Sequence, residues 1–391
     1  MAFQSHRDRR ADIANALLAW YDCHRRDLPW RAPPGECTDP YKVWLSEIML
    51  QQTRVAAAIP YYERFLERFP DVGALADAPE EEVLRQWAGL GYYSRARNLQ
   101  KAARQITAEH GSRFPDAAEK AVALSGIGAY TAAAILSIAY GKQLAVLDGN
   151  VARVIARLGA IRGDLRTASR WQQLQKSADE LLAPDAPGDW NQAMMELGAT
   201  ICTPRSPQCL LCPASESCEA RKLGLTDVIP EKRGKRAAVE IMLASLVTVD
   251  PQGRTLLLPP PSADGKSATA EDVTVLLSRM WHFPTIQVKG DATRELRAFA
   301  RKFSLLDHKS RVRLLALRKV RHAVTYRQIT LLPFRVDVLK LPVVAGTKAL
   351  PLSDLSAVPV SNLTRKVARA ALSPEESTRK NLSALTISLH Y

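Results

Sequence analysis

Four closely spaced cysteines form the clearest ligand pattern in the chain. They are Cys202, Cys209, Cys212 and Cys218, spaced C-x6-C-x2-C-x5-C. Disulfides and inert buried thiols fit poorly, because these thiols are crowded into proline-rich loops of a chain that shows no secretory signal. Four thiolates suit either a structural zinc or a 4Fe-4S cluster. The single short pair with longer arms favours the cluster, and zinc is the competing interpretation.

A second pattern combines two glycines, a helix and an aspartate. Gly126 and Gly128 predict a turn with positive φ or a closely approaching partner. Small and apolar residues at helical spacing follow over 129–139, and Gly141 supplies a stop signal. Since free N–H groups at the start of a helix attract anions, this turn is suited to a phosphate. Asp148 precedes a further amphipathic helix, which it could simply cap.

Size, composition and charge limit the class of protein. The 391 residues predict two or three domains, and 47% hydrophobic residues indicate a globular chain. No apolar run is long enough to cross a membrane and no leader pattern is found, so we expect a cytoplasmic protein without membrane contacts. The net charge of +14 favours a polyanionic partner, although a merely basic protein would show the same balance.

The texture of the sequence predicts two domains. Helical patterns extend over 1–225, and the polar, basic stretch 226–238 reads as a linker. Short strand patterns follow over 239–366, interrupted by one helix at about 293–303, which is typical of an α+β domain. We expect 367–391 to be a loosely held tail.

The motifs together resemble a known family. The glycine turn, the aspartate and the four cysteines resemble the helix-hairpin-helix superfamily of DNA glycosylases, in its iron–sulfur branch. Within that branch, five segments resemble the MutY adenine DNA glycosylases: DLPWR, VWLSEIMLQQTRV, GLGYYSRARNL, LDGNVARV and NQAMMELGATICTPRSPQC. The resemblance covers the first domain essentially end to end.

The resemblance implies a fold and an activity. It implies an all-α helix-hairpin-helix glycosylase domain with an iron–sulfur cluster loop, followed by a C-terminal α+β Nudix-like domain. A six-helix barrel would occupy about 32–142, and the cluster-bearing half would combine 1–31 with 143–225. The expected activity is excision of adenine opposite 8-oxoguanine or guanine in duplex DNA. We expect a monomer that associates with the nucleoid through its DNA.

Two carboxylates would then share the chemistry. Glu47 lies in an apolar helical stretch, where burial raises a carboxyl pKa and keeps a proton available for N7 of adenine. Asp148, beside Asn150, would stabilise the sugar cation or attack it transiently. Each has a simpler interpretation: Glu47 could be a partly exposed residue paired with Arg54, and Asp148 or Asn150 could cap a helix.

Tyr130 decides the reaction type under this resemblance. The related endonuclease III glycosylases hold a lysine at this place, which attacks the sugar and leads to strand cleavage. A phenol cannot form that Schiff base. We therefore expect a monofunctional enzyme that leaves an abasic site, although a tyrosine here could also serve packing alone.

Further positions carry over from the matching motifs. The adenine pocket would be formed by Arg26, Leu28, Trp30, Arg31 and Gln192. Contacts with DNA near the opposite base would come from Gln52, Thr53, Leu90 and Tyr92, while Gly126 and Gly128 would bind a phosphate.

The resemblance thins in the second domain. WHFPT (281–285) matches a family segment, but RELRAF (294–299) lacks the paired glutamates of a Nudix metal site. Pyrophosphate hydrolysis is therefore not expected. In the loop that reads 8-oxoguanine, Val324, Thr325 and Tyr326 replace the family's Phe-Ser-His, and Thr325 keeps a hydroxyl.

Two other functions stay open at this point. An endonuclease III-like lyase for damaged pyrimidines is disfavoured by Tyr130 and by the second domain. A non-catalytic iron–sulfur DNA-binding protein would need neither Glu47 nor Asp148.

Overall fold

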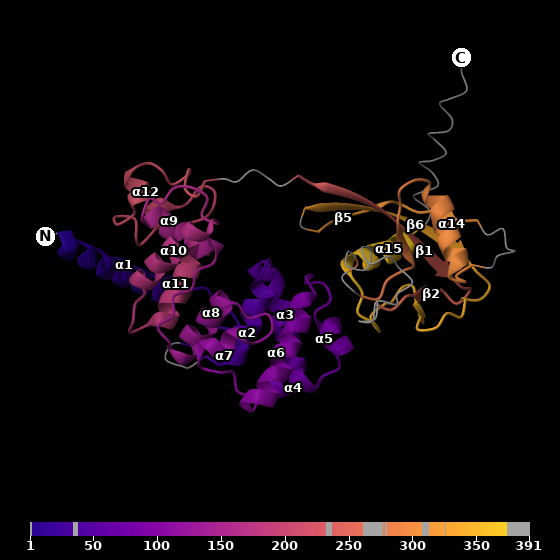
Figure 1. The fold of residues 1–391 in the computed structure, drawn as a ribbon, viewed down its shortest axis with the longest axis horizontal. Helices are drawn as coiled ribbons and strands as arrows, with labels where there is room; N and C mark the ends of the chain where they lie inside the picture. Colours follow the sequence, from indigo (N-terminus) through magenta and orange to yellow (C-terminus); the bar gives the residue numbers. More distant parts are fainter. Residues whose placement is uncertain are drawn as a thin grey trace, which may run out of the picture. The chain divides into compact units, whose positions relative to one another are not determined.

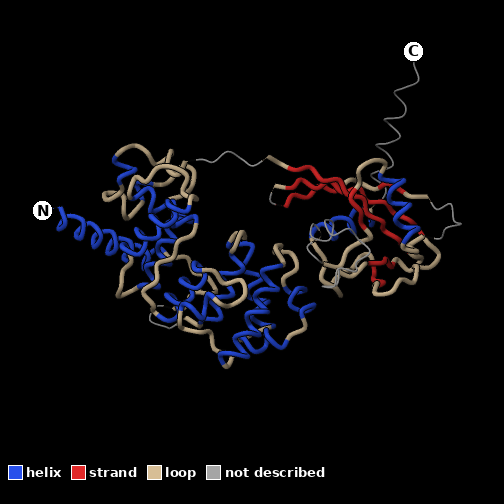
Figure 2. Tube along the Cα trace, viewed as in Figure 1, coloured by secondary structure: helices blue, strands red, loops and turns tan. Residues whose placement is uncertain are grey.

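The computed structural model describes residues 2–33, 38–231, 237–260, 277, 280–306, 313–324 and 326–373. The chain divides into two compact units. The helical unit comprises residues 1–78 and 97–234, and the sheet unit comprises residues 79–96 and 235–391. Figures 1 and 2 show helices throughout the first and a sheet with flanking helices in the second.

The helices up to the cysteine loop have the following bounds: α1 (Ala2–His24), α2 (Pro40–Leu50), α3 (Val55–Arg68), α4 (Val72–Asp77), α5 (Glu80–Gln86), α6 (Ser94–His110), α7 (Ala118–Val122), α8 (Ala129–Tyr140), α9 (Gly149–Leu158), α10 (Ala168–Leu181), α11 (Pro187–Thr200), η1 (Cys209–Leu211) and α12 (Glu219–Lys222). Of these, α5 belongs to the sheet unit. Among the residues described, no helix is both long and apolar enough to cross a membrane.

Helix α8 lies at the centre of the helical unit. Its residues 131–137 are all buried, because α2 and α11 both pack against it. A helix that is apolar on every side requires such cover. Gly141 ends the helix in the left-handed conformation, with φ of 64°. The predicted helix and its stop signal are therefore confirmed.

In the second unit the strands are β1 (Val239–Val249), β2 (Arg254–Leu257), β3 (Thr285–Gln287), β4 (Leu315–Ala316), β5 (Val320–Val324), β6 (Arg327–Asp337) and β7 (Lys348–Pro351), with helices α14 (Ala292–Lys302) and α15 (Asn362–Leu372). Within the described residues the strands form one sheet in the order β4-β6-β1-β2-β7, with β3 paired to β1 and β5 to β6. The β1–β6 pair is parallel, and the remaining pairs are antiparallel.

Helices cover both faces of this sheet. Along β1, Leu243 and Val247 pack in one apolar cluster with α15, whereas Ala244 and Leu246 pack in another with α14. Successive side chains of a strand point to opposite faces, so β1 is buried on both. The α+β prediction is confirmed.

Some predicted boundaries differ from the observed ones. Helix α15 continues past residue 366 to Leu372, and Val367 and Ala371 are buried in the core. The first part of the expected tail therefore belongs to the folded domain. Residues 272–280, part of the stretch in which short strands were expected, lie largely outside the described residues.

Candidate active site

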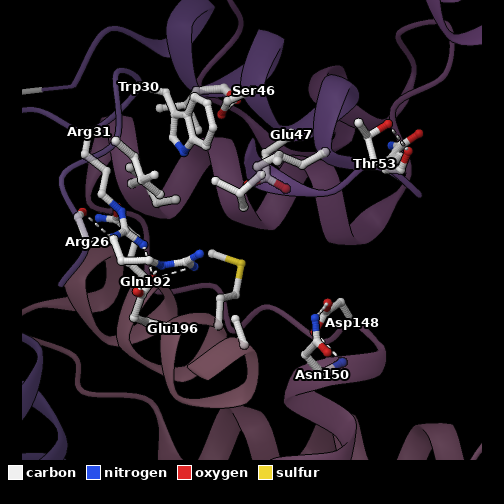
Figure 3. Close-up of a pocket in the computed structure, with 18 of the residues that line it drawn as sticks. Arg26, Trp30, Arg31, Ser46, Glu47, Thr53, Asp148, Asn150, Gln192 and Glu196 are labelled. Atoms are coloured by element: carbon white, nitrogen blue, oxygen red, sulfur yellow. Dashed lines mark hydrogen bonds and ion pairs between the residues drawn. The ribbon is translucent and has the colours of Figure 1, made fainter. Parts of the chain in front are cut away.

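One cavity of about 590 Å³ brings together side chains from several helices of the helical unit. Figure 3 shows Glu47 and Asp148 on its wall, with Arg26, Arg31 and Glu196 grouped away from them. The predicted catalytic and base-pocket residues all line it, together with two of the predicted DNA contacts. These are Arg26, Leu28, Trp30, Arg31, Glu47, Gln52, Thr53, Tyr130, Asp148, Asn150 and Gln192.

Glu47 lies on α2 and is only 8% exposed. Its burial raises the pKa to about 7; the hydrogen bond from Tyr130 lowers it and the charge of Asp148 raises it. The hydroxyl of Tyr130 donates this bond to Oε2 of Glu47 at 2.7 Å. Glu47 can therefore hold a proton near neutral pH, as a general acid must.

Tyr130 lies in the first turn of α8, and its hydroxyl is also 3.3 Å from the sulfur of Met195. Burial, followed by the charges of Glu47 and Asp148, raises the pKa of this phenol well above its ordinary value. The phenol therefore keeps its proton and acts as a donor. It has no chemistry with which to form a Schiff base.

Asp148 is the N-cap of α9. Its Oδ1 accepts hydrogen bonds from the backbone N–H groups of Asn150 at 2.9 Å and Val151 at 2.7 Å. The side-chain amide of Asn150 donates to Oδ2 at 3.1 Å. The capping interpretation and the cavity position thus apply to the same side chain, because the cap fixes a carboxylate that also faces the cavity.

Arg153 forms a hydrogen bond with the side chain of Asn150. Its guanidinium donates to Oδ1 of Asn150 at 3.0 Å, to the carbonyl of Gly198 at 2.8 Å and to the carbonyl of Cys202 at 2.9 Å. Arg153 is buried. The start of the cysteine loop is therefore tied to the amide that supports Asp148.

Another part of the cavity wall carries a second buried glutamate. Nε and Nη2 of Arg26 donate to Glu196 at 2.5 and 3.0 Å, and Nη2 of Arg31 donates to it at 2.7 Å. Burial alone would raise the pKa of Glu196, but the hydrogen bonds and charges of both arginines outweigh it and lower the pKa.

The four cysteines line a separate small cavity with apolar side chains and Arg157. Arg157 is buried and places Nη1 at 3.3 Å from the sulfur of Cys202. Across the described ranges, no group of three or more His, Cys, Asp or Glu residues is close enough together to hold a metal ion. All four cysteines nevertheless line the same hollow.

The prediction that the turn needs glycine for its conformation is confirmed at Gly126 but not at Gly128. Gly126 has φ of 78°, and a Cβ there would meet Cβ of Asn98 at 2.7 Å, so glycine is required. Gly128 has φ of −95° and serves as the N-cap of α8, and a Cβ added to it would meet no atom within 4 Å. Only Gly126 therefore needs glycine for conformation, whereas Gly128 leaves the start of α8 open.

The remaining predicted DNA contacts lie elsewhere. Leu90 and Tyr92 belong to the sheet unit, and Tyr92 is 40% exposed with φ of 48°. Thr325 lies outside the described residues, and the strands that flank it, β5 and β6, pair as a hairpin.

Residues 45–183 match the profile of the HhH-GPD superfamily of base excision DNA repair proteins. This part of the chain is similar to the HhH-GPD domain of those proteins. This match includes Glu47, Tyr130 and Asp148, and it ends before the cysteine loop.

Curated relatives extend the likeness beyond the HhH-GPD domain. The chain is 50% identical to the human adenine DNA glycosylase over 212 residues, which are 53% of this chain and 39% of the human protein. It is 37% identical to the adenine DNA glycosylase of Arabidopsis thaliana over 315 residues, which are 72% of this chain and 48% of that protein. The chain therefore spans about half the length of these relatives or less.

A solved structure supports the fold of the HhH-GPD domain. A thermostable thymine-DNA glycosylase superposes with a TM-score of 0.51 at 28% identity, over 56% of this chain and 99% of that one. The helical architecture is therefore that of a DNA glycosylase, joined here to a C-terminal α+β region.

Several residues of the site were not predicted from the sequence. Glu196, Met195 and Arg153 contact predicted site residues, and the first two line the cavity. A signal for Glu196 was present, because it follows Gln192 by four positions and so lies on the same face of α11.

Proposed function

We propose that the protein is a monofunctional adenine DNA glycosylase that hydrolyses the N-glycosidic bond of adenine opposite 8-oxoguanine or guanine in duplex DNA. The observation that carries this proposal is Glu47, buried with a pKa of about 7 and hydrogen-bonded by Tyr130, in the same cavity as Asp148. The names of the curated relatives give the base, and the HhH-GPD domain gives the reaction class.

The two carboxylates would divide the reaction between them. Glu47, protonated near neutral pH, would donate its proton to N7 of the departing adenine. Asp148, fixed by its three hydrogen bonds, would place negative charge beside the sugar cation. Removing one preorganised group of this kind typically costs about 3–4 kcal/mol of barrier stabilisation.

The base must leave the duplex to reach this cavity, whose volume suits a flipped nucleotide. Trp30 and Leu28 supply apolar surface, and Arg26, Arg31 and Gln192 supply polar groups. Gln52 and Thr53 line the same cavity just beyond the end of α2, where they would meet DNA. The N-terminus of α8 behind Gly128 would receive a phosphate, as backbone N–H groups at helix starts do.

We propose that Cys202, Cys209, Cys212 and Cys218 hold a 4Fe-4S cluster. The donor set fits, because all four thiols line one small cavity and four cysteine ligands are what such a cluster requires. When bound, the cluster would cross-link the loop that begins at Cys202. Arg153 would then restrict the motion of Asn150, since its guanidinium donates hydrogen bonds both to the carbonyl of Cys202 in that loop and to the side chain of Asn150. Purified protein should be yellow-brown, whereas a zinc site would be colourless.

The C-terminal region would act as a Nudix-like module that recognises 8-oxoguanine. A mixed sheet covered by α14 and α15 supports this proposal. Glu295, in the segment that resembles a Nudix helix, accepts the backbone N–H of Gly290 at 2.6 Å and so has a structural use. Recognition would then depend on the β5–β6 hairpin, and pyrophosphate hydrolysis is not proposed.

One assay tests the activity. The purified protein is incubated with a duplex containing adenine opposite 8-oxoguanine, and strands are analysed with and without alkali. We expect breaks only after alkali. Breaks without alkali would support the lyase alternative, and intact adenine in both arms would overturn the proposal.

A further inference from the structure

The hydroxyl of Tyr130 lies within hydrogen-bond distance of two acceptors but has a single proton to donate. Oε2 of Glu47 is 2.7 Å from the phenol oxygen, and the thioether sulfur of Met195 is 3.3 Å from it. An ionised carboxylate is a strong acceptor, whereas a thioether is a weak one. The proton therefore goes to the carboxylate whenever Glu47 is ionised, and the sulfur then receives none.

The arrangement changes when Glu47 holds a proton. A protonated carboxyl is itself a donor, and the phenol oxygen can accept a proton that sits on Oε2. The phenolic proton must then turn elsewhere, because burial raises the pKa of Tyr130 well above its ordinary value and keeps the hydroxyl protonated. Among the described residues, the sulfur of Met195 is the other acceptor of this hydroxyl. A buried O–H group without an acceptor would cost free energy.

Packing between helices fixes the three groups relative to one another. Glu47 lies on α2, Tyr130 in the first turn of α8 and Met195 on α11, and α8 packs against both of the other helices. Met195 is partly buried against the apolar core of the helical unit and also borders the cavity. The core therefore holds the sulfur beside the phenol, whichever acceptor the proton serves.

Other ionisable side chains line the same cavity. They are Asp148 at the start of α9, and Glu196 with its partners Arg26 and Arg31. Burial is the main cause of the raised pKa of Glu47, the bond from Tyr130 lowers it, and the charge of Asp148 raises it. The charge of Glu196 is balanced by its two arginines. The phenol is therefore the group through which Met195 can act on Glu47.

We propose that Met195 is a positioning residue for the general acid: its sulfur accepts the proton of Tyr130 while the phenol oxygen accepts the proton of Glu47, which stabilises the protonated carboxyl. The inference rests on the proposed function, in which Glu47 protonates the departing base. When that proton leaves Oε2 for the base, the phenolic proton turns from the sulfur to Oε2 and stabilises the carboxylate that remains. One hydroxyl thus serves Glu47 before and after the transfer.

The test is a titration of the Glu47 carboxyl in the DNA-free protein. Glutamate is labelled with ¹³C at the carboxyl, and the resonance of Glu47 is the one that disappears in Glu47→Gln. The titration is repeated for Met195→Leu, which keeps the approximate volume but has no acceptor, and for Met195→Gln, whose carbonyl oxygen accepts more strongly than sulfur. The matched control is Met194→Leu, the same exchange at the adjacent position of α11, where the side chain is 2% exposed and packed in the core.

For Met195→Leu we expect the pKa of Glu47 to fall by about 0.5, because the protonated state loses a weak hydrogen bond while the ionised state loses none. The alkaline limb of single-turnover excision should move to lower pH by the same amount. Met195→Gln should not lower the pKa, and Met194→Leu should leave it at the wild-type value. In Tyr130→Phe, which has no phenolic proton to place, adding Met195→Leu should produce no further shift.

A pKa of Glu47 that stays unchanged or rises in Met195→Leu would overturn the inference. Equal shifts in Met195→Leu and Met194→Leu would overturn it too, as would a shift that persists in the Tyr130→Phe background. The thermal midpoint reports folding. If Met195→Leu does not fold, Met195→Gln decides: a lowered pKa counts against the inference, and an unchanged or raised one supports it.

The wild-type excision assay is separate from this titration, which needs no substrate. A wild type that leaves adenine intact refutes the proposed function and does not alter the titration. An active wild type, together with an unmoved titration in Met195→Leu, refutes only the role of Met195.

Discussion

Two regions of the same cavity each carry a buried glutamate, and their surroundings give them opposite properties. Around Glu47 the nearest partner is a neutral phenol, so burial dominates and the pKa rises to about 7. Around Glu196 two guanidinium groups outweigh burial and the pKa falls. The comparison teaches that the partner, and not the depth of burial, decides whether a carboxyl stores a proton or anchors a cation.

The largest effect is expected at the proton-storing region. Glu47→Gln keeps the shape of the side chain but removes its transferable proton, so single-turnover excision should fall by about 10²- to 10⁴-fold. Binding of the abasic duplex should not change. If Glu47→Gln excised adenine at near the wild-type rate while Glu196→Gln did not, the general acid would lie elsewhere. The contrast between a proton-storing Glu47 and a cation-binding Glu196 would then be wrong.

Asp148→Asn should have the next largest effect, a fall of about 10²- to 10³-fold in single-turnover rate, typical of losing one preorganised electrostatic group. Because the amide can still cap α9, stability should change little. The control is Asp71→Asn, which alters the cap of α4, where Asp71 accepts from the N–H of Ala74. If both substitutions lowered the rate equally, capping alone would explain the role of Asp148.

The two glutamates should also respond to pH in opposite ways when stability is measured. The pKa of Glu47 in the folded protein lies above the ordinary 4.5, so its contribution is present below about pH 4.5 and is lost as pH rises through about 7. Glu196 has a lowered pKa, so its contribution is present above pH 4.5 and is lost as pH falls through the folded value.

Urea unfolding from pH 3 to 8 measures this difference. Glu47→Gln should remove the wild-type decline between about pH 4.5 and 7, which amounts to roughly 3–4 kcal/mol at 1.4 kcal/mol per pKa unit. Glu196→Gln should flatten the acid side instead. If both variants altered the same pH range, the contrast between the two regions would be wrong.

The sequence predicted the Glu47 region better than the Glu196 region, for a physical reason. The apolar residues next to Glu47 in the sequence are enough to predict that its side chain is buried. The helix that ends at Gly141 is likewise predicted from residues that are neighbours in the sequence. The partners of Glu196 lie 170 and 165 positions away, so only the packing of α11 beside the 26–31 segment creates that site. The end of helix α15, residues 367–372, was predicted as tail for a related reason, since its burial depends on the sheet beneath it.

The smallest effect is expected for a substitution at Tyr130, the neutral partner of Glu47. Tyr130→Phe removes the hydrogen bond that lowers the pKa of Glu47, so that pKa should rise further. Because the protonated acid is required, excision falls as pH rises through this pKa, and the alkaline limb of the rate profile should move to higher pH. The rate at its plateau should fall by about tenfold, since Glu47 loses its orienting donor.

Tyr140→Phe is the matched control for this substitution. The hydroxyl of Tyr140 donates to the carbonyl of Phe114 at the other end of α8, so its removal should leave the alkaline limb in place. A limb that moved to lower pH in Tyr130→Phe would mean that the phenol stabilises the protonated acid. The contrast between a neutral donor at Glu47 and two cations at Glu196 would then fail to explain why the two pKa values move in opposite directions.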